Sequence, residues 1–392
     1  MPLRTIEELP MRGRRVFVRA DLNVPLEDGA IADTLRIDEA LPSIKWVIAN
    51  GGRPVIASHL GRPKGGRDPK LSLRPIAEYL GEVLHVEASF AEDCVGDAVR
   101  EQSRALGPKQ VLVLENLRFH PEEERNDDAF SRELASLCDV YVNDAFGAAH
   151  RAHASVVGMV PYVADHGMGN LMKKEIDHLT PLLGSPERPY IVILGGAKVS
   201  DKLGVIRSLL QRVDALLLGG AMAYTFLAAQ GVNVGDSRTE PDRFDTAREI
   251  LDEAKKRGVN VVLPVDHVAA PEISPEAMTQ VLGPDIPAGF KGVDIGPATI
   301  RRFGNEIAHA KTIFWNGPLG IFEIEPFSHG TFAIVEEVAR SGAFSVIGGG
   351  DSAAAVMRSG MQDDITHVST GGGASLEFLE GIELPALRAL AS

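Results

Sequence analysis

The chain has 392 residues, more than one hydrophobic core usually supports, so two domains are expected. Hydrophobic residues make up 44% of it and charged residues 24%, as is typical of a globular protein. The net charge of −14 argues against a nucleic-acid or anionic-membrane partner, because both require a broad basic surface.

The first segment of the chain departs from this acidic balance. Residues 1–75 hold 13 Lys and Arg against nine Asp and Glu, which predicts a local pocket for anions. The amino terminus has no apolar core of a signal peptide, so we expect a cytoplasmic protein. The two cysteines, Cys94 and Cys138, have no metal-type spacing and indicate neither a disulfide framework nor a zinc site.

Short apolar runs alternate with helical patterns along the first half. Strands are expected at 15–19, 54–58, 84–88, 111–114 and 140–142, and amphipathic helices around 35–48, 76–83 and 130–137. Pro42 interrupts the first helical pattern, so that helix is expected to begin later than its pattern suggests. A helix at 169–183 ends at the breaker-rich stretch 184–189, where we place the boundary between the domains.

The second half repeats the alternation. Strands are expected at 191–194, 215–218, 259–263, 312–315, 344–347 and 365–368, with helices such as 202–210, 242–256 and 330–339 between them. Near-continuous apolar strands alternating with helices indicate an α/β protein with two doubly wound, Rossmann-like parallel sheets joined by a hinge helix. The expected segments are residues 1–168, 169–189, 190–370 and 371–392, of which the last is expected to contain a helix.

Anion-binding side chains follow the expected strands of the first half. Ligands of open parallel sheets lie beyond the carboxyl ends of the strands, so these residues should share one edge. Singly, an Arg or a His is more often a surface or structural residue, but the joint set is Arg- and His-rich and fits a small anion. The runs are 19–23, 58–62, Ser89, 115–118 and 143–147.

The second half offers glycines at the corresponding positions. Runs 195–198, 219–221, 316–318 and 348–352 bring bare backbone amides and a Lys to one edge, which favours a polyphosphate. Lys198 and Lys202 lie one helical turn apart at an expected helix start, where cations are unfavourable unless an anion joins them. No P-loop motif is present, which excludes P-loop nucleotide binding at the motif level, and no Gly-x-Gly-x-x-Gly follows the first strand, which argues against a nicotinamide dehydrogenase.

Seven segments in order make the chain resemble the phosphoglycerate kinase family from end to end. They are 19–25 (RADLNVP), 58–65 (SHLGRPKG), 143–151 (NDAFGAAHR), 195–202 (GGAKVSDK), 315–322 (WNGPLGIF), 348–352 (GGGDS) and 370–373 (TGGG). Where many members have Val-Asp-Phe-Asn, this chain has Ala-Asp-Leu-Asn at 20–23, which keeps the Asp and the Asn. Ser352 stands where others have Thr and keeps the hydroxyl.

The resemblance implies reversible transfer of the acyl phosphate of 1,3-bisphosphoglycerate to ADP, with 3-phosphoglycerate and ATP as products. It implies substrate binding in the first domain by Asp21, Leu22, Asn23, Arg36, His59, Leu60, Gly61, Arg62, Arg118 and Arg151. It implies nucleotide binding in the second domain by Gly195, Gly196, Lys198, Lys202, Gly219, Gly220, Asn316, Pro318, Glu323, Gly348, Gly349, Gly350, Asp351 and Ser352. It also implies that the final segment returns to the first domain.

The chemistry implied for the site needs charge stabilisation more than proton transfer. In the ATP-consuming direction the acceptor is a carboxylate, which is ionised at neutral pH, so no general base is needed. The resemblance assigns stabilisation of the transferred phosphoryl group to Arg36, Lys202 and the amides of Gly372 and Gly373. Asp351 is expected to hold the Mg²⁺ of the nucleotide. Both half-sites are encoded in one chain, so we expect a monomer that closes on its small-molecule substrates.

Three alternatives share parts of this pattern. A two-domain dehydrogenase would share the fold, but the dinucleotide fingerprint is missing. A two-domain anion-binding protein would share the closure, but the nucleotide-type loop at 348–352 and the missing export signal argue against it. A kinase for another small carboxylate would share the reaction class, but the Arg and His set fits a phosphorylated substrate.

Overall fold

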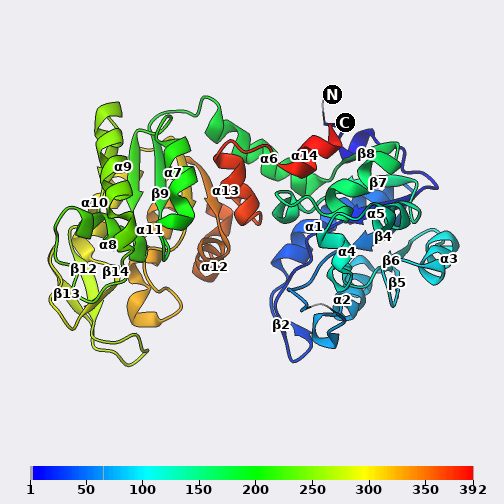
Figure 1. The fold of residues 1–392 in the computed structure, drawn as a ribbon, viewed down its shortest axis with the longest axis horizontal. Helices are drawn as coiled ribbons and strands as arrows, with labels where there is room; N and C mark the ends of the chain where they lie inside the picture. Colours follow the sequence, from blue (N-terminus) through cyan, green and yellow to red (C-terminus); the bar gives the residue numbers. More distant parts are fainter. Residues whose placement is uncertain (1–2, 65, 392) are drawn as a thin grey trace. The chain divides into compact units, whose positions relative to one another are not determined.

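The computed structural model describes residues 3–64 and 66–391, in two compact units (Figure 1). Unit 1 runs to Asp177 and resumes at Glu383, and unit 2 runs from His178 to Ile382. Helix α6 (Asn170–Leu183), expected at 169–183, contains the first of these divisions. Residues 1–2 and 392, at the ends of the expected segments, and Gly65 of the 58–65 run lie outside the described residues.

Unit 1 is built on a parallel sheet of order β5-β6-β4-β1-β7-β8. Its strands are β1 (Arg15–Arg19), β4 (Arg53–Ala57), β5 (Glu87–Phe90), β6 (Gln110–Val113), β7 (Val140–Asn143) and β8 (Asp165–Met168). Its other helices are α1 (Leu35–Ala49), α2 (Arg74–Leu84), α3 (Asp97–Ala105), α4 (Pro121–Glu124), α5 (Asp128–Ala135) and α14 (Pro385–Leu390). A small hairpin pairs β2 (Leu26–Glu27) with β3 (Ala30–Ile31).

Unit 2 has a second parallel sheet, of order β11-β10-β9-β15-β16-β17. Its strands are β9 (Tyr190–Leu194), β10 (Ala215–Leu218), β11 (Asn260–Val262), β15 (Thr312–Asn316), β16 (Phe344–Gly348) and β17 (His367–Val368). The helices are α7 (Leu203–Leu209), α8 (Gly220–Ala229), α9 (Phe244–Arg257), α10 (Pro297–Ile307), α11 (His329–Ser341), α12 (Gly350–Ser359) and α13 (Gly373–Leu379). The expected α/β class with two parallel sheets is therefore confirmed.

A three-stranded antiparallel sheet in unit 2 was not expected from the sequence. It has the order β13-β12-β14, with β12 (His267–Ala270), β13 (Gln280–Leu282) and β14 (Lys291–Ile295). Two of its strands have exposed or half-buried residues on part of their length, so they lack the apolar run that marks a buried strand. The sheet matters for function because β14 borders the cleft described below.

Helix α1 begins at Leu35 and contains Pro42, so the expectation of a later start is wrong. Proline removes one backbone donor and crowds the preceding turn, which is costly inside a helix. Here Ile37, Leu41 and Ile44 are buried against the sheet on both sides of the proline. Their burial outweighs the local cost, and Arg36 is consequently held in the first turn of the helix.

Helix α14 packs within unit 1, although it lies more than two hundred residues from the other elements of that unit in sequence. Figure 1 shows it, in red, beside β8 near the chain ends, and it contacts β8 and the π-helical turn η5 (Ala154–Gly158). The amide of Ala386 donates to the carbonyl of Ala149 at 3.1 Å. Residues 371–382, including α13, belong to unit 2.

Candidate active site

Strand register brings the anion-binding segments of unit 1 to one sheet edge. Arg19, the last residue of β1, lies opposite Ala57 of β4 and Asn143 of β7. The segments that leave these strands, 20–23, 58–62 and 144–147, therefore meet at a single edge, as the parallel arrangement requires. Backbone amides tie the segments together: Leu22 N donates to Ser58 Oγ at 2.9 Å, and Gly61 N donates to Asn23 Oδ1 at 2.8 Å.

Two predicted contact residues offer only their backbone. The side chains of Leu22 and Leu60 are buried in the core of unit 1, and Leu60 N donates to Asn116 Oδ1 at 3.2 Å. Gly61 has a φ of +61°, and a Cβ there would lie 2.7 Å from Leu71 Cδ2, so the position demands glycine. These residues shape the edge of the sheet.

Arg36 and Asp21 form an ion pair at this edge. The side chain of Asp21 is 7% exposed and that of Arg36 is 32% exposed, so Arg36 remains partly accessible to a ligand. Gly147 lies directly beneath the pair, because a Cβ on it would come within 2.4 Å of Asp21 Oδ2. The pair joins the first turn of α1 to the end of β1, and it brings a second loop, 144–147, against the same carboxylate.

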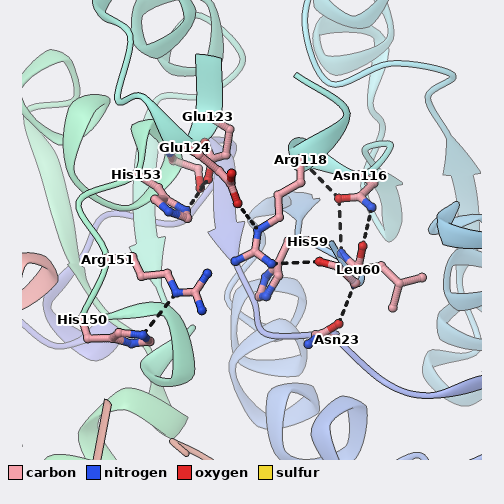
Figure 2. A network of polar contacts seen from close by, with 12 residues as sticks. Asn23, His59, Leu60, Asn116, Arg118, Glu123, Glu124, His150, Arg151 and His153 are labelled. Atoms are coloured by element: carbon pink, nitrogen blue, oxygen red, sulfur yellow. Dashed lines mark hydrogen bonds and ion pairs between the residues drawn. The ribbon is translucent and has the colours of Figure 1, made fainter. Parts of the chain in front are cut away.

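His59, Arg118 and Arg151 point toward one another in Figure 2, and together they form the basic cluster of unit 1. Burial and the nearby cations Arg19, Arg118 and Arg151 hold the pKa of His59 well below its ordinary value. Burial, Arg151 and Arg19 likewise lower the pKa of Arg118 to about 10. Mutual repulsion of this kind marks a site that is short of negative charge.

Carboxylates compensate the cluster only in part. Glu124 lies 3.4 Å from Arg118 Nε, and Arg118 Nη1 donates to the carbonyl of Gly61 at 2.9 Å. Arg151 Nε donates to His150 Nε2 at 3.2 Å, a neutral partner. Arg62, which was also predicted to bind the substrate, is exposed and makes no ion pair among the described residues, so its role stays a prediction.

Four functional neighbours of the cluster were missed by the sequence analysis. They are Glu123, His150, His153 and Ser155, all in or next to the predicted runs. Burial and the arginines of the cluster lower the pKa of His153 to about 3. The sequence carried one usable signal, because His150 and His153 flank Arg151; the buried acid Glu123 sits among three adjacent acidic residues and nothing local distinguishes it.

Unit 2 contains a cleft of about 440 Å³ at the corresponding edge of its sheet. The register of β9, β10, β15 and β16 aligns Leu194 with Leu218 and Asn316, and Asn316 with Gly348, so the glycine runs leave the sheet together. Five predicted residues line the cleft: Gly196, Gly220, Pro318, Glu323 and Asp351. The lining also includes residues that were not predicted, among them Tyr224, Arg238, Lys291 and Asp294.

Gly195 and Gly219 form the support of the cleft and are absent from its lining. A Cβ on Gly195 would lie 2.2 Å from the carbonyl oxygen of Pro318, and one on Gly219 would lie 2.4 Å from Leu319 Cδ2. Two backbone segments cross in contact here, and Gly196 N donates to the Pro318 carbonyl at 2.8 Å. Glycine is required because no side chain fits between the segments.

Lys202 donates to Asn316 Oδ1, and burial lowers its pKa while Asp201 and Asp351 act in the opposite direction. Lys198 is exposed. Lys202 lies in the short helical turn Ser200–Lys202, and Lys198 precedes it; the carboxylate of Glu240 accepts from Val199 N at 2.6 Å and from Ser200 N at 3.1 Å at the start of this turn. The amino end of this turn is thus already capped by the carboxylate of Glu240.

The Gly348–Ser352 run joins β16 to α12. Gly349 has a φ of +96°, and Ser352 Oγ accepts from Gly317 N at 2.6 Å, so the hydroxyl ties this run to the 316–318 loop. Asp351 lies in the first turn of α12 and is exposed. The 370–373 run leads into α13, where Gly372 has a φ of +55° and Gly373 is the first helical residue.

Asp294 is a buried acid on the wall of the cleft. Its carboxylate accepts from Gly330 N at 2.6 Å and from Ile295 N at 2.9 Å. Burial nevertheless raises the pKa of Asp294 to about 7, because these two hydrogen bonds offset only part of the desolvation cost. A Cβ on Gly320 or Gly330 would lie within 2.4 Å of Asp294 Oδ1, so the backbone closes tightly around this carboxyl.

A basic cluster in one α/β unit and a glycine-lined cleft in the other define a class of protein: a kinase-type enzyme that handles a small anion and a nucleotide separately. The family model for phosphoglycerate kinase matches residues 6–382. The phosphoglycerate kinases of Anaeromyxobacter dehalogenans (strain 2CP-C) and Koribacter versatilis are 54% and 52% identical to this chain, over 99% and 98% of both chains.

Solved structures agree with the sequence comparison. The structure of phosphoglycerate kinase from Coxiella burnetii matches with a TM-score of 0.89 and 39% identity, over 100% of this chain and 99% of that one. The enzyme from Pyrococcus horikoshii OT3 matches with a TM-score of 0.87 and 36% identity, over 98% of each chain. The chain belongs to the phosphoglycerate kinase family, which confirms the resemblance.

The chain is accordingly a phosphotransferase with a carboxyl group as acceptor, and its reaction is the glycolytic one: 1,3-bisphosphoglycerate and ADP are interconverted with 3-phosphoglycerate and ATP. This excludes the alternatives of a dehydrogenase, an anion-binding protein and a kinase for another carboxylate. Among the helices of the described residues, none is long and apolar enough to cross a bilayer.

Proposed function

We propose that the basic cluster of unit 1 binds 3-phosphoglycerate and 1,3-bisphosphoglycerate. Asp21 and Asn23 would hold the hydroxyl and carboxylate region, and His59, Arg62, Arg118 and Arg151 would enclose the remote phosphate. The observation that carries the proposal is the convergence of His59, Arg118 and Arg151, where burial and then the neighbouring arginines hold the pKa of His59 and of Arg118 below their ordinary values. A phosphate dianion would relieve this repulsion, and guanidinium groups match its oxygens geometrically.

We propose that the cleft of unit 2 binds ADP and ATP. The bare backbones of Gly196, Gly220 and Pro318 would contact the adenine, supported from below by Gly195 and Gly219, and Glu323 would accept from the ribose hydroxyls. Lys198 and Lys202 would reach the phosphates near the 348–352 loop. Lys202 would then exchange its neutral partner Asn316 for phosphate oxygens, which are stronger acceptors for a half-buried ammonium group.

The residues present fit a Mg²⁺ ion bound with the nucleotide. Asp351 borders the cleft, and within the described residues its carboxylate makes no hydrogen bond or ion pair, so its oxygens are available to a cation. Mg²⁺ is normally held by one or two carboxylates together with phosphate oxygens. The ion would neutralise charge on the phosphate groups of the nucleotide.

The chain's own residues would promote transfer through position and charge. The attacking carboxylate of 3-phosphoglycerate needs no base, since it is ionised at neutral pH. Arg36, Lys202 and the amides of Gly372 and Gly373 would stabilise the charge on the transferred phosphoryl group. The two substrates bind to different units, so we infer that closure accompanies binding of both and keeps water from the reaction. We further propose that the enzyme acts as a monomer in the cytoplasm.

Formation of the acyl phosphate tests the proposal directly. Purified protein would be incubated with MgATP, 3-phosphoglycerate and hydroxylamine, which traps the acyl phosphate as a hydroxamate. We expect hydroxamate only when the acceptor and Mg²⁺ are both present. Alanine substitutions of Arg118 and Lys198 would then assign the half-sites, because the first should raise the KM for 3-phosphoglycerate and the second the KM for ATP. The opposite pattern would refute the assignment.

A further inference from the structure

Arg19 is a fully buried arginine whose guanidinium has a polar partner at each nitrogen. It stands at the end of β1, behind the basic cluster, with 0% of its surface exposed. Nε donates to Ser155 Oγ at 2.8 Å, and Nη1 donates to the carbonyl of Ala20 at 2.5 Å. Nη2 lies 3.2 Å from Nδ1 of His59. A cation buried this completely is retained only where its contacts are specific.

The contact between Arg19 and His59 determines which ring nitrogen carries the proton. A guanidinium group has only donors and stays protonated in proteins, so Nδ1 of His59 must accept the hydrogen bond. An imidazole whose Nδ1 accepts carries its proton on Nε2 and is neutral. The surrounding cations Arg36, Arg118 and Arg151, which come from three other segments, act in the same sense because they oppose a further positive charge.

Glu123 and Ser155 hold Arg19 in place from the far side. Glu123 has 0% exposure, and its two oxygens accept from Ser155, from the hydroxyl at 2.5 Å and from the amide at 2.9 Å. The hydroxyl of Ser155 donates to Glu123 and accepts from Arg19, so its orientation is determined at both ends. Glu123 also balances the charge of Arg19, while His153 Nδ1 lies 3.8 Å from Glu123 Oε1.

We infer that Glu123, Ser155 and Arg19 form a positioning chain that keeps His59 as a neutral imidazole with its proton on Nε2. His59 then presents one donor to the anion site and no acceptor. This inference rests on the proposed substrate site for its consequence: a phosphate dianion, which has acceptors alone, is matched, whereas a protonated phosphate finds no acceptor on His59 for its hydroxyl group. The tautomer itself does not depend on the identity of the ligand.

The tautomer can be measured on the ligand-free full-length protein. Long-range proton–nitrogen NMR spectra of protein labelled with ¹⁵N-histidine distinguish the two neutral tautomers and the imidazolium, and the His59→Gln variant assigns the signal of His59. We expect the Nε2–H pattern at pH 7. An Nδ1–H pattern or an imidazolium would overturn the inference. Because no substrate is present, this result stands apart from the proposed function, which the hydroxamate assay tests.

Substitution of Ser155 by alanine tests the chain behind His59. It removes the hydroxyl that joins Arg19 to Glu123 and leaves the amide of Ser155 on Glu123, so the fold should persist. We expect loss of the single Nε2–H pattern and about a tenfold rise in the KM for 3-phosphoglycerate, the size expected when one hydrogen bond to a charged group is weakened, with kcat changed much less. An unchanged spectrum and KM would show that Ser155 does not act through His59.

Ser131→Ala is the matched control. Ser131 is also buried in unit 1, and its hydroxyl donates to the carbonyl of Asp127 without touching Arg19, Ser155 or Glu123. It should leave both the spectrum and the KM unchanged; the same rise in KM in both variants would indicate a general packing defect and overturn the positioning role.

Two substitutions of His59 itself give an independent readout. The amide nitrogen of glutamine lies near the position of Nε2 in histidine, and that of asparagine near Nδ1. His59→Gln should therefore retain a lower KM for 3-phosphoglycerate than His59→Asn, because only the former keeps a donor on the ligand side. The reverse order would contradict a donor at Nε2.

Discussion

The two units build their candidate binding sites from different parts of the chain. Unit 1 uses side chains: the basic cluster of His59, Arg118 and Arg151, together with Arg36, is supplied by four different segments. Unit 2 uses its backbone, since glycines at 195–196 and 219–220 let main-chain segments approach one another and the cleft. Charged forks suit a small anion, and a flat backbone surface suits a large planar base with a phosphate tail.

The two units also differ in the direction in which burial shifts the pKa of their titratable side chains. In unit 1 burial and neighbouring cations lower the pKa of His59 and of His153, so both bases stay neutral near their cations. In the cleft of unit 2 burial raises the pKa of Asp294 to about 7, so this acid stays protonated in mildly acidic solution and loses its proton near neutral pH. Unit 1 also holds a buried acid of this kind, Asp144: burial raises its pKa to about 6, and its carboxylate accepts from the amides of Leu171 and Met172 at the start of α6.

The largest predicted effect concerns the charge that each unit supplies to the transferred group. Arg36→Ala and Lys202→Ala should each lower kcat by roughly 10³-fold or more, about 4 kcal/mol of transition-state stabilisation. The melting temperature should change little in Lys202→Ala, where the lysine donates to a neutral amide, and should fall modestly in Arg36→Ala, because the nearly buried Asp21 loses its ion-pair partner. Steady-state kinetics and thermal unfolding of each variant measure the two quantities.

The exposed Lys255→Ala, at the end of α9, is the matched control and should leave kcat unchanged. Near-normal turnover in either site variant would contradict the prediction for that unit, because it would show that the substituted cation does not stabilise the transferred group.

Asp294→Asn should remove a pH dependence that belongs to unit 2. The folded-state pKa of Asp294 is raised from 3.8 to about 7, so its stabilising protonated form is fully present below pH 3.8 and is lost as the pH rises through 7. At 1.36 kcal/mol per pKa unit the whole loss between pH 3.8 and pH 7 is roughly 4 kcal/mol, of which about 2.7 kcal/mol falls between pH 5 and pH 8. Relative to the variant, the parent protein should therefore become less stable between pH 5 and pH 8.

Denaturant unfolding of both proteins at the two pH values gives this difference directly. Parallel curves, with a constant difference between parent and variant, would mean that Asp294 is ionised in the folded protein and that the contrast in protons between the units is wrong.

Two glycine-to-alanine substitutions should distinguish a glycine packed against backbone from a glycine packed against the end of a side chain. In Gly195→Ala the new Cβ meets the backbone carbonyl of Pro318 at 2.2 Å, which cannot move freely, so a loss of about 1–3 kcal/mol of stability is expected. In Gly147→Ala the Cβ meets Asp21 Oδ2, the end of a side chain, at 2.4 Å. Asp21 can rotate away from Arg36, so activity should fall more than stability.

Urea unfolding and kcat/KM for 3-phosphoglycerate, measured on both variants, report the two effects. Gly283→Ala serves as the control, because a Cβ there meets nothing within 4 Å and should change neither quantity. Equal losses of stability in Gly195→Ala and Gly147→Ala would contradict the division between backbone and side-chain support.

Much of the fold could be predicted because its strands are buried on both faces. The runs ending at Leu194 and Leu218 are apolar throughout, those ending at Arg19 and Ala57 are apolar in their middle, and such runs separated by amphipathic helices indicate parallel sheets. Strand β13 escaped detection because its residues are exposed or half-buried, and the start of α1 was misplaced because packing of its apolar face overrode the local effect of Pro42.

Candidate site residues that follow a strand could be predicted from the sequence. Residues that only support those side chains from the interior of the unit could not. Asp21 and His59 come directly after the strand ends, whereas Glu123 and Ser155 lie on segments whose approach to Arg19 depends on the tertiary fold. Gly195 illustrates a further limit of local patterns: the sequence marks it as a ligand contact, which stays a prediction, and the structure places it where two backbone segments meet. Spacing along the chain does not distinguish these two uses of glycine.

The smallest predicted effect is on the stability of unit 2 and concerns a carboxylate side chain that accepts hydrogen bonds from backbone amides. The carboxylate of Glu240 accepts from the amides of Val199 and Ser200, at the start of the turn that contains Lys202. Although desolvation opposes ionisation, hydrogen bonds from Ser200 and Val199 lower the pKa of Glu240, so its stabilisation is present at neutral pH and is lost in acid as the pH falls below its usual range near 4.5. Glu240→Gln should cost about 1 kcal/mol at pH 7, as for other helix caps, and less at pH 4. Urea unfolding of both proteins at pH 4 and pH 7 measures this cost. An equal cost at the two pH values would show that the amides of Val199 and Ser200 need an oxygen acceptor but no negative charge.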